Sequence, residues 1–281
     1  MQSYFFPLLK VKYVQIISKK IIMELYMKRL TIKMTALLLG IIVGVSAVAV
    51  SANTEYSWYI KRRGHDLPEF HENAKILSKY NAFCVDNSAF ENEEKIIYLT
   101  FDAGYENGNI SKILDVLKEE NVPAAFFILD NIIYKNPELV ERMAEEGHIV
   151  CNHTRKHKNH SNSTIEEIAT DLNSLERLCL ERTGVEMAKC FRFPEGKYSI
   201  ESLEAVSNLG YKTFFWSFGY DDWDNAKQPD KQKSIKKILD NTHNGEILLL
   251  HPTSATNAQI LPVLIKEWRK MGYSFGIINK I

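Results

Sequence analysis

Short apolar runs alternate with segments of helical periodicity from residue 95 to the C-terminus. In the first such segment, Ile110, Ile113, Leu114 and Leu117 recur every three or four positions and would share one helix face. The apolar runs predict strands at 95–101, 124–129, 148–153, 189–193, 212–218, 246–251 and 273–278. The segments between them predict helices at 110–122, 137–147, 164–184, 199–210, 231–245 and 259–272.

Strands that are apolar throughout and separated by helices are typical of a parallel sheet covered on both faces. We therefore predict an α/β domain over 95–281, built either as a barrel or as an open doubly wound sheet. Five of the helix candidates end on a glycine, as a left-handed C-terminal cap favours. These glycines are Gly147, Gly184, Gly210, Gly245 and Gly272.

Residues 53–94 precede this alternation and are interpreted as a leader onto the domain. The stretch WYIKRRGHDLPEF at 58–70 is too irregular for a strand or a helix, and a short helical stretch is expected near 72–80. We find no internal repeat or low-complexity tract in the chain.

The N-terminal part has the pattern of an export signal. MKRLTIK at 27–33 is basic, and the apolar run at 34–53 carries no charge. Small residues predict signal-peptide cleavage after Ala52, with Ala49 as a second candidate. The run is also close to the roughly 20 residues that span a bilayer, so retention as a membrane anchor stays open. Either outcome places 55–281 outside the cytoplasm.

The first 26 residues fit no part of a signal peptide. Met27 would be a more natural first residue. We therefore predict that 1–26 result from a misplaced start codon and that 27–52 form the signal peptide or membrane anchor.

Composition indicates a core-forming globular protein, since 45% of the residues are hydrophobic and 11% are aromatic. Thirty-five basic residues balance thirty-five acidic ones, which argues against a nucleic-acid partner. The cysteines show no CxxC spacing, and we expect buried thiols without a disulfide. They are Cys84, Cys151, Cys179 and Cys190.

Ionisable side chains stand at or just after the ends of five strand candidates. Because the carboxyl ends of the strands of an α/β barrel open on one face, these groups would converge there. A single such residue is most often a hydrogen-bonded loop residue, but five together favour a functional site. The five are Asp102, His153, Arg192, Asp222 and His251.

HTRKH at 153–157 places two histidines four positions apart, a spacing that suits a divalent metal. The alternative is two solvated histidines, and His160 nearby is expected at the surface. A metal with two histidine ligands would need a carboxylate as a third, and TFDAG at 100–104 is the expected source.

Five stretches in the chain together resemble the motifs of the NodB-type polysaccharide deacetylases, carbohydrate esterase family 4. They are TFDAGYENG at 100–108, HTRKH at 153–157, FRFPEG at 191–196, SFGYDDW at 217–223 and ILLLH at 247–251. The resemblance covers about 95–281. It implies a distorted seven-stranded parallel (β/α) barrel and a metal-dependent hydrolase that cleaves acetamide bonds of glycans.

The leader at 58–68 and the loop DDWDNAKQPD at 221–230 look most like the sporulation branch of this family. Its members remove acetyl groups from N-acetylmuramic acid, so that muramic δ-lactam can form in spore-cortex peptidoglycan. The resemblance therefore implies peptidoglycan glycan strands as the partner. It also implies a location in the cell wall or in the intermembrane space of the forespore.

The resemblance assigns roles to the strand-end residues. Asp102 would be the general base that activates water, and Arg192 would hold its carboxylate ionised. His251 would protonate the departing amine as general acid, and Asp222 would orient and charge it.

The resemblance also implies substrate contacts and metal ligands. The backbone N–H of Glu195 would stabilise the oxyanion, and Trp216 and Trp223 would help to form the substrate pocket. His153 and His157 would hold the metal.

Position 103 departs from the family pattern. Typical members carry a second aspartate there as the third protein ligand, whereas this chain has Ala103, as members of the sporulation branch often do. Two protein nitrogens select weakly among metals, so zinc is expected first, with cobalt and manganese open.

Two other functions stay open. The chain could deacetylate another glycan, such as an N-acetylglucosamine polymer, or be a catalytically inactive glycan-binding homologue, which Ala103 favours. The presence of both an acid and a base argues against the second. Glycoside hydrolysis is disfavoured because it needs two facing carboxylates and no metal.

Overall fold

The computed structural model describes residues 18–34 and 53–281. The chain divides into two units, Met1–Ala52 and Asn53–Ile281. In the first unit, residues 18–34 are helical and their side chains are exposed. No helix within the two described ranges is both long and apolar enough to cross a membrane. The predicted cleavage sites at Ala49 and Ala52 lie outside the described residues.

A parallel sheet forms the centre of the second unit and contains all seven predicted strands. Its order is β11 (Glu246–Leu250), β5 (Ile96–Ala103), β6 (Ala124–Ile128), β7 (Ile149–Asn152), β8 (Ala188–Phe191), β10 (Lys212–Phe214) and β4 (Ala82–Phe83), with β12 (Ser274–Phe275) also paired to β5. Isolated bridges Phe218↔Leu248 and Val85↔Glu246 connect the β10 and β4 side back to β11. The predicted parallel (β/α) barrel architecture is therefore confirmed.

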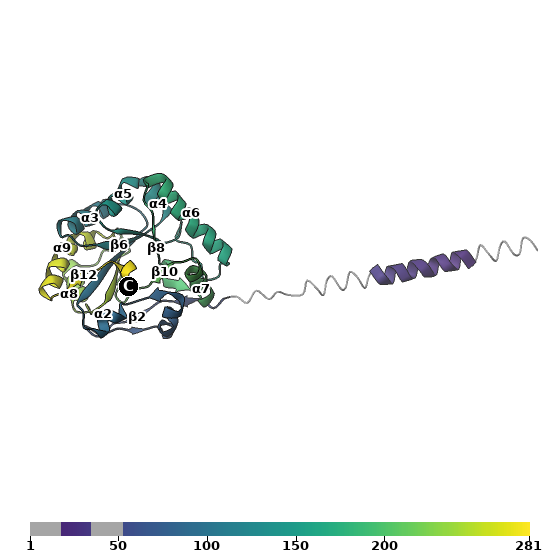
Figure 1. The fold of residues 1–281 in the computed structure, drawn as a ribbon, viewed down its shortest axis with the longest axis horizontal. Helices are drawn as coiled ribbons and strands as arrows, with labels where there is room; N and C mark the ends of the chain where they lie inside the picture. The colour runs from purple at the N-terminus through teal and green to yellow at the C-terminus, as the bar shows by residue number, and fades with distance from the viewer. Residues whose placement is uncertain (1–17, 35–52) are drawn as a thin grey trace, which may run out of the picture. The chain divides into compact units, whose positions relative to one another are not determined.

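The six predicted helices are also present, and helices surround the strands (Figure 1). They are α3 (Ile110–Glu119), α5 (Pro137–Glu145), α6 (Ile165–Thr183), α7 (Ile200–Asn208), α8 (Lys231–Leu239) and α9 (Ala255–Lys270), joined by the shorter α2 (Asn87–Glu91) and α4 (Asp130–Lys135). The 3-10 helices are η1 (Glu72–Tyr80), η2 (Pro194–Gly196) and η3 (Ile278–Lys280). The helical stretch predicted near 72–80 is thus a 3-10 helix.

Gly245 is not the helix cap that the sequence predicted. Helix α8 ends at Leu239, and Gly245 lies in the turn before β11 with φ 73°. A Cβ atom at this position would lie 2.3 Å from the Asp86 carbonyl oxygen. The turn therefore requires glycine for its close approach to Asp86.

Residues 53–94, interpreted as a leader, belong to the same compact unit as 95–281. They supply β4 to the sheet. Short strands of two residues form where no strand was predicted. Strand β2 (Ile60–Lys61) pairs with β3 (Glu69–Phe70), and β1 (Tyr56–Ser57) pairs with β9 (Lys197–Tyr198). Trp58 is 5% exposed and its ring stacks on Phe215 at 4.7 Å.

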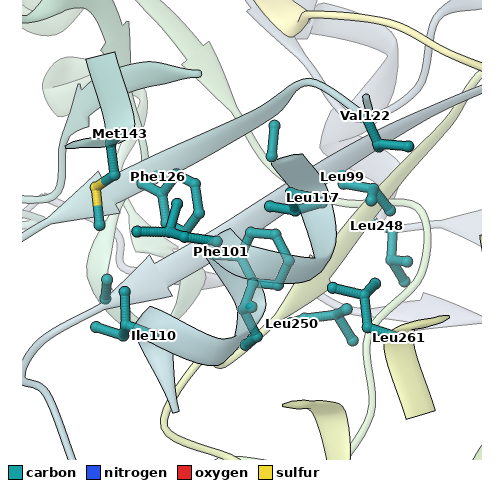
Figure 2. Packing of buried hydrophobic residues seen from close by; sticks show 14 of the residues in the cluster. Leu99, Phe101, Ile110, Leu117, Val122, Phe126, Met143, Leu248, Leu250 and Leu261 are labelled. Atoms are coloured by element: carbon teal, nitrogen blue, oxygen red, sulfur yellow. The ribbon is translucent and has the colours of Figure 1, made fainter. Parts of the chain in front are cut away.

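Alternation along β5 divides its side chains between two apolar clusters. Ile97, Leu99, Phe101 and Ala103 face the outer cluster between sheet and helices, where Phe101 stacks on Phe126 (Figure 2). Tyr98 faces the inner cluster, which includes Phe127, Phe214 and Ile278. Because side chains alternate along a strand, Asp102 shares the inner face with Tyr98 and lies at its carboxyl end.

Candidate active site

The carboxyl ends of the strands bring the five predicted ionisable residues together. Asp102 is the penultimate residue of β5, His153 follows β7, Arg192 follows β8 and His251 follows β11, while Asp222 is in the loop after β10. Pairwise contacts connect Asp102 to both Arg192 and His153, and Asp222 to His251. The predicted convergence of these side chains is observed.

Arg192 and Asp102 form a buried ion pair. The Arg192 side chain is 0% exposed, and its Nη1 donates to Asp102 Oδ1 at 2.8 Å. Its Nε and Nη2 donate to the carbonyl oxygens of Phe214 and Phe215, and the guanidinium lies 4.2 Å from the Phe127 ring centroid. Burial is the largest single effect and would raise the pKa of Asp102, but the charge and hydrogen bond of Arg192, together with the charges of His153 and His251, outweigh it, and the pKa is lowered. Asp102 is therefore a carboxylate at neutral pH.

A second carboxylate holds His251. Nδ1 of His251 donates to Asp222 Oδ1 at 2.7 Å, and the His251 backbone N–H donates to Asp222 Oδ2 at 2.9 Å. Asn257 Nδ2 also donates to Asp222 Oδ2, so both oxygens of this fully buried carboxylate are satisfied. Burial alone would lower the pKa of His251, but the hydrogen bond and charge of Asp222 raise it. The ring is thus prepared to carry a proton, with Nε2 left for the cleft.

His153 is prepared to act as a neutral ligand. Its Nδ1 must carry the proton, because it donates to the Arg192 carbonyl oxygen at 2.9 Å. This leaves a lone pair on Nε2, which lies 3.6 Å from Asp102 Oδ2. Burial lowers the pKa of His153 to about 4. The His157 ring lies 5.0 Å away, edge to face.

The loop that carries both histidines is held in an unusual backbone conformation. Thr154 and His157 have φ values of 68° and 57°, in the left-handed region that non-glycine residues rarely adopt. The Thr154 N–H donates to Asn152 Oδ1, and the Arg155 N–H donates to Asp171 Oδ1 on α6. Strained residues of this kind persist where surrounding contacts fix them, as they do here.

These residues fit a divalent cation held by two ring nitrogens. A ligating imidazole commonly donates its other N–H to a carbonyl, as His153 does. A third protein ligand is not evident: within 18–34 and 53–281 no cluster of three or more His, Cys, Asp or Glu residues has metal-binding geometry. Ala103 is 0% exposed in the outer apolar cluster.

An open cleft is lined by all three predicted substrate contacts. It is lined by Arg62, Asp102, His157, Glu195, Trp216, Gly219, Tyr220, Asp221, Trp223, Leu249 and His251. Glu195 has φ 57°, and its N–H donates to no acceptor in the described part of the chain. Trp223 is 62% exposed at the cleft, whereas Trp216 is partly buried beside the cluster that contains Trp58.

Gly196 allows Trp216 to sit beside this cleft. A Cβ at position 196 would lie 2.8 Å from Trp58 Cβ and 2.9 Å from Trp216 Cη2, and the residue has φ 64°. Only glycine satisfies both conditions, which explains the last residue of the FRFPEG stretch.

The prediction that His160 lies at the surface was wrong. The ring is 0% exposed, and its two nitrogens contact Asp171 Oδ2 at 2.6 Å and Ser163 Oγ at 2.9 Å. Because Asp171 also accepts from the Arg155 N–H, His160 supports the histidine-bearing loop. Nothing in the sequence around His160 indicates that its ring is buried.

Arg62 and Asn257 were also missed by the sequence analysis. Arg62 comes from the irregular stretch at 58–70, and Asn257 is in the first turn of α9. Neither stands at the end of a predicted strand, where candidate residues were sought; Arg62 follows β2, a two-residue strand that was not predicted.

Comparison with known proteins gives consistent matches. The family described as polysaccharide deacetylase matches residues 90–214. The peptidoglycan-N-acetylmuramic acid deacetylase PdaA of Bacillus subtilis is 35% identical over 240 residues, 85% of this chain and 90% of the relative. A peptidoglycan-N-acetylglucosamine deacetylase of Bacillus cereus is 31% identical over 195 residues, 68% and 89% of the two chains. The solved structure of B. subtilis PdaA, a family 4 carbohydrate esterase, superposes with a TM-score of 0.76 at 36% identity, covering 81% and 97%.

Proposed function

Because the chain belongs to the polysaccharide deacetylase family, hydrolases that cleave amide bonds of acetylated glycans, we propose that it removes the acetyl group from N-acetylmuramic acid in peptidoglycan. The names of the two relatives support peptidoglycan as the substrate. We further propose that this reaction serves muramic δ-lactam formation in the spore cortex, and that the enzyme works outside the cytoplasm.

One observation carries the proposed chemistry: a single cleft is lined by a carboxylate with a lowered pKa and an imidazole with a raised pKa. Amide hydrolysis needs both, a base for the water and an acid for the nitrogen. A glycan-binding protein without activity would need neither.

In the proposed mechanism, Asp102 takes a proton from water as the water oxygen bonds to the acetyl carbon. Arg192 keeps Asp102 ionised for this step. The N–H of Glu195 donates to the oxygen that becomes negative. The C–N bond then breaks as His251 gives its proton to the sugar nitrogen, which releases acetate and a free amine.

His153 and His157 would hold a divalent metal, zinc in our proposal with cobalt and manganese as alternatives. When bound there, the metal would supply a Lewis acid beside the acetyl group. The neutral state of His153 suits this role, because a protonated imidazole cannot ligate.

The test is acetate release by the purified protein from peptide-free glycan strands that contain both sugars. We expect release to depend on added zinc, cobalt or manganese, with deacetylated muramic acid found by mass spectrometry. Acetate lost only from N-acetylglucosamine would support the other deacetylase, and none with any metal would contradict hydrolysis.

The metal ligands are tested in the same assay by His157→Gln, a change at an exposed side chain. We expect about tenfold or more metal to be needed for half-maximal activity, on the scale of losing a metal contact. Exposed His65→Gln is the control. An unchanged metal requirement, with full metal content by mass spectrometry, would exclude His157 as a ligand.

Asp222→Asn should move the alkaline limb of the kcat/KM profile to lower pH. His251 acts while protonated, so activity falls as pH rises through its pKa. Removing the Asp222 charge weakens the largest causes that raise this pKa and leaves the Asp102 charge as the remaining one, so burial lowers the pKa. The profile of the residual activity is measured beside Asp240→Asn, a surface change. An unmoved limb would remove His251 as the acid.

A further inference from the structure

We propose that Arg62 binds a carboxylate on the substrate, so that the cleft selects an acidic acetylated sugar over a neutral one. This inference rests on the deacetylase function proposed above and adds a specificity-determining residue to it.

Arg62 differs from its two basic neighbours in the structure. Lys61 Nζ lies 3.0 Å and Arg63 Nη1 4.0 Å from the carboxylate of Glu69, at the β2–β3 pair. Arg62 instead has no ion-pair partner among the residues that the structure describes. Three consecutive basic residues thus include one whose charge is not balanced.

Contacts with Phe218 and Gly219 hold the Arg62 side chain at the cleft. Its guanidinium lies 5.1 Å from the Phe218 ring centroid, and Nη2 donates to the Gly219 carbonyl oxygen at 2.6 Å. Gly219 and Arg62 line the same cleft as Asp102 and His251. The side chain is therefore positioned by one hydrogen bond, which leaves other N–H groups of the guanidinium available.

Most of the other ionisable residues in the cleft are paired with an opposite charge, whereas Arg62 has no such partner in the part of the chain that the structure describes. Three of the other ionisable residues that line it have partners of opposite charge, in the pairs Asp102–Arg192, Glu195–Lys197 and His251–Asp222. Exposed Asp221 is the acidic lining residue that, within the described ranges, has no such partner. Arg62 thus provides a cation that a substrate anion can use.

A guanidinium recognises carboxylates through two parallel hydrogen bonds. N-acetylmuramic acid carries a lactyl ether on the carbon next to the one that bears the acetamide. Its carboxylate, when free, lies close to the reacting group, whereas N-acetylglucosamine has a hydroxyl there. Arg62 would therefore distinguish the two sugars at the site of reaction.

The test compares two substrates that differ at the lactyl group: peptide-free glycan with the lactyl carboxylate free, and the same glycan with that group converted to its uncharged methyl amide. We expect Arg62→Gln to lower kcat/KM on the acid by about tenfold, the scale of one charged hydrogen bond at a partly exposed site, and to change it little on the amide. Arg62→Lys should retain part of the preference.

Arg63→Gln is the matched control, since its charge is already paired with Glu69, and it should leave both rates unchanged. Equal losses on acid and amide, or none on either, would overturn the assignment of Arg62 while leaving deacetylation in place. No acetate from either substrate with unaltered enzyme would instead refute the proposed function. Independently of any variant, the acid preference of the unaltered enzyme should shrink as salt rises, and equal rates at low salt would also overturn the inference.

Discussion

Replacing Asp102 with asparagine should lower kcat/KM for acetate release by at least about a hundredfold, the lower range for losing a general base. The amide keeps the size of the side chain and can still accept from Arg192, but it cannot take a proton. Asp102 Oδ1 already accepts from Nη1 of Arg192, so Oδ2 is the oxygen available for this proton. The loss should appear mainly in kcat.

Folding and metal content separate this role from others. The variant should unfold cooperatively and bind metal as the unaltered protein does, since His153 and His157 are unchanged. Asp115→Asn is the matched control, because that carboxylate is 65% exposed and pairs with Arg142 on the helical surface. Undiminished acetate release by Asp102→Asn would rule out Asp102 as the base.

The convergence of Asp102, His153, Arg192 and His251 could be predicted from sequence, because the register of a parallel barrel places all strand ends on one face. The long apolar runs made the strands clear. Strand β4 was missed because two residues between turns carry no periodic pattern. Its pairing depends on β10, which is distant in sequence.

The ion-pair and hydrogen-bond partners of individual side chains could not be predicted in the same way. Three consecutive residues, Lys61, Arg62 and Arg63, carry the same charge in the sequence. Only the tertiary structure shows that two of them pair with Glu69 while Arg62 lines the cleft. Burial of His160 likewise depends on Asp171, which α6 brings to the loop. By comparison with the family pattern, Ala103 lacks the carboxylate that would be a third metal ligand. In the fold it is a buried residue packed in the outer cluster.

Replacing Arg192 with methionine should destabilise the protein by about 3–5 kcal/mol at pH 7, the range for breaking a buried ion pair by removing one partner. Methionine fills much of the volume beside Phe127. It leaves the buried Asp102 carboxylate unpaired and the carbonyl oxygens of Phe214 and Phe215 without these donors. Denaturant unfolding measures the loss, and Arg269→Met, which breaks a partly exposed pair with Glu120, should cost less than about 1 kcal/mol.

The pH dependence of this loss identifies its cause. In the unaltered protein the pKa of Asp102 is lowered, so its ion pair stabilises the fold above the pKa of the unfolded chain and is lost as pH falls through the folded value. Without Arg192 only the opposing effect of burial and the weaker histidine charges remain, so the pKa rises and protonation relieves the buried charge. The difference in unfolding free energy between Arg192→Met and the unaltered protein should therefore shrink from pH 7 towards about pH 5. Adding Asp102→Asn to the variant should recover part of the stability at pH 7, because it removes the unpaired charge. A loss that is independent of pH and additive with Asp102→Asn would mean that Arg192 acts through packing alone.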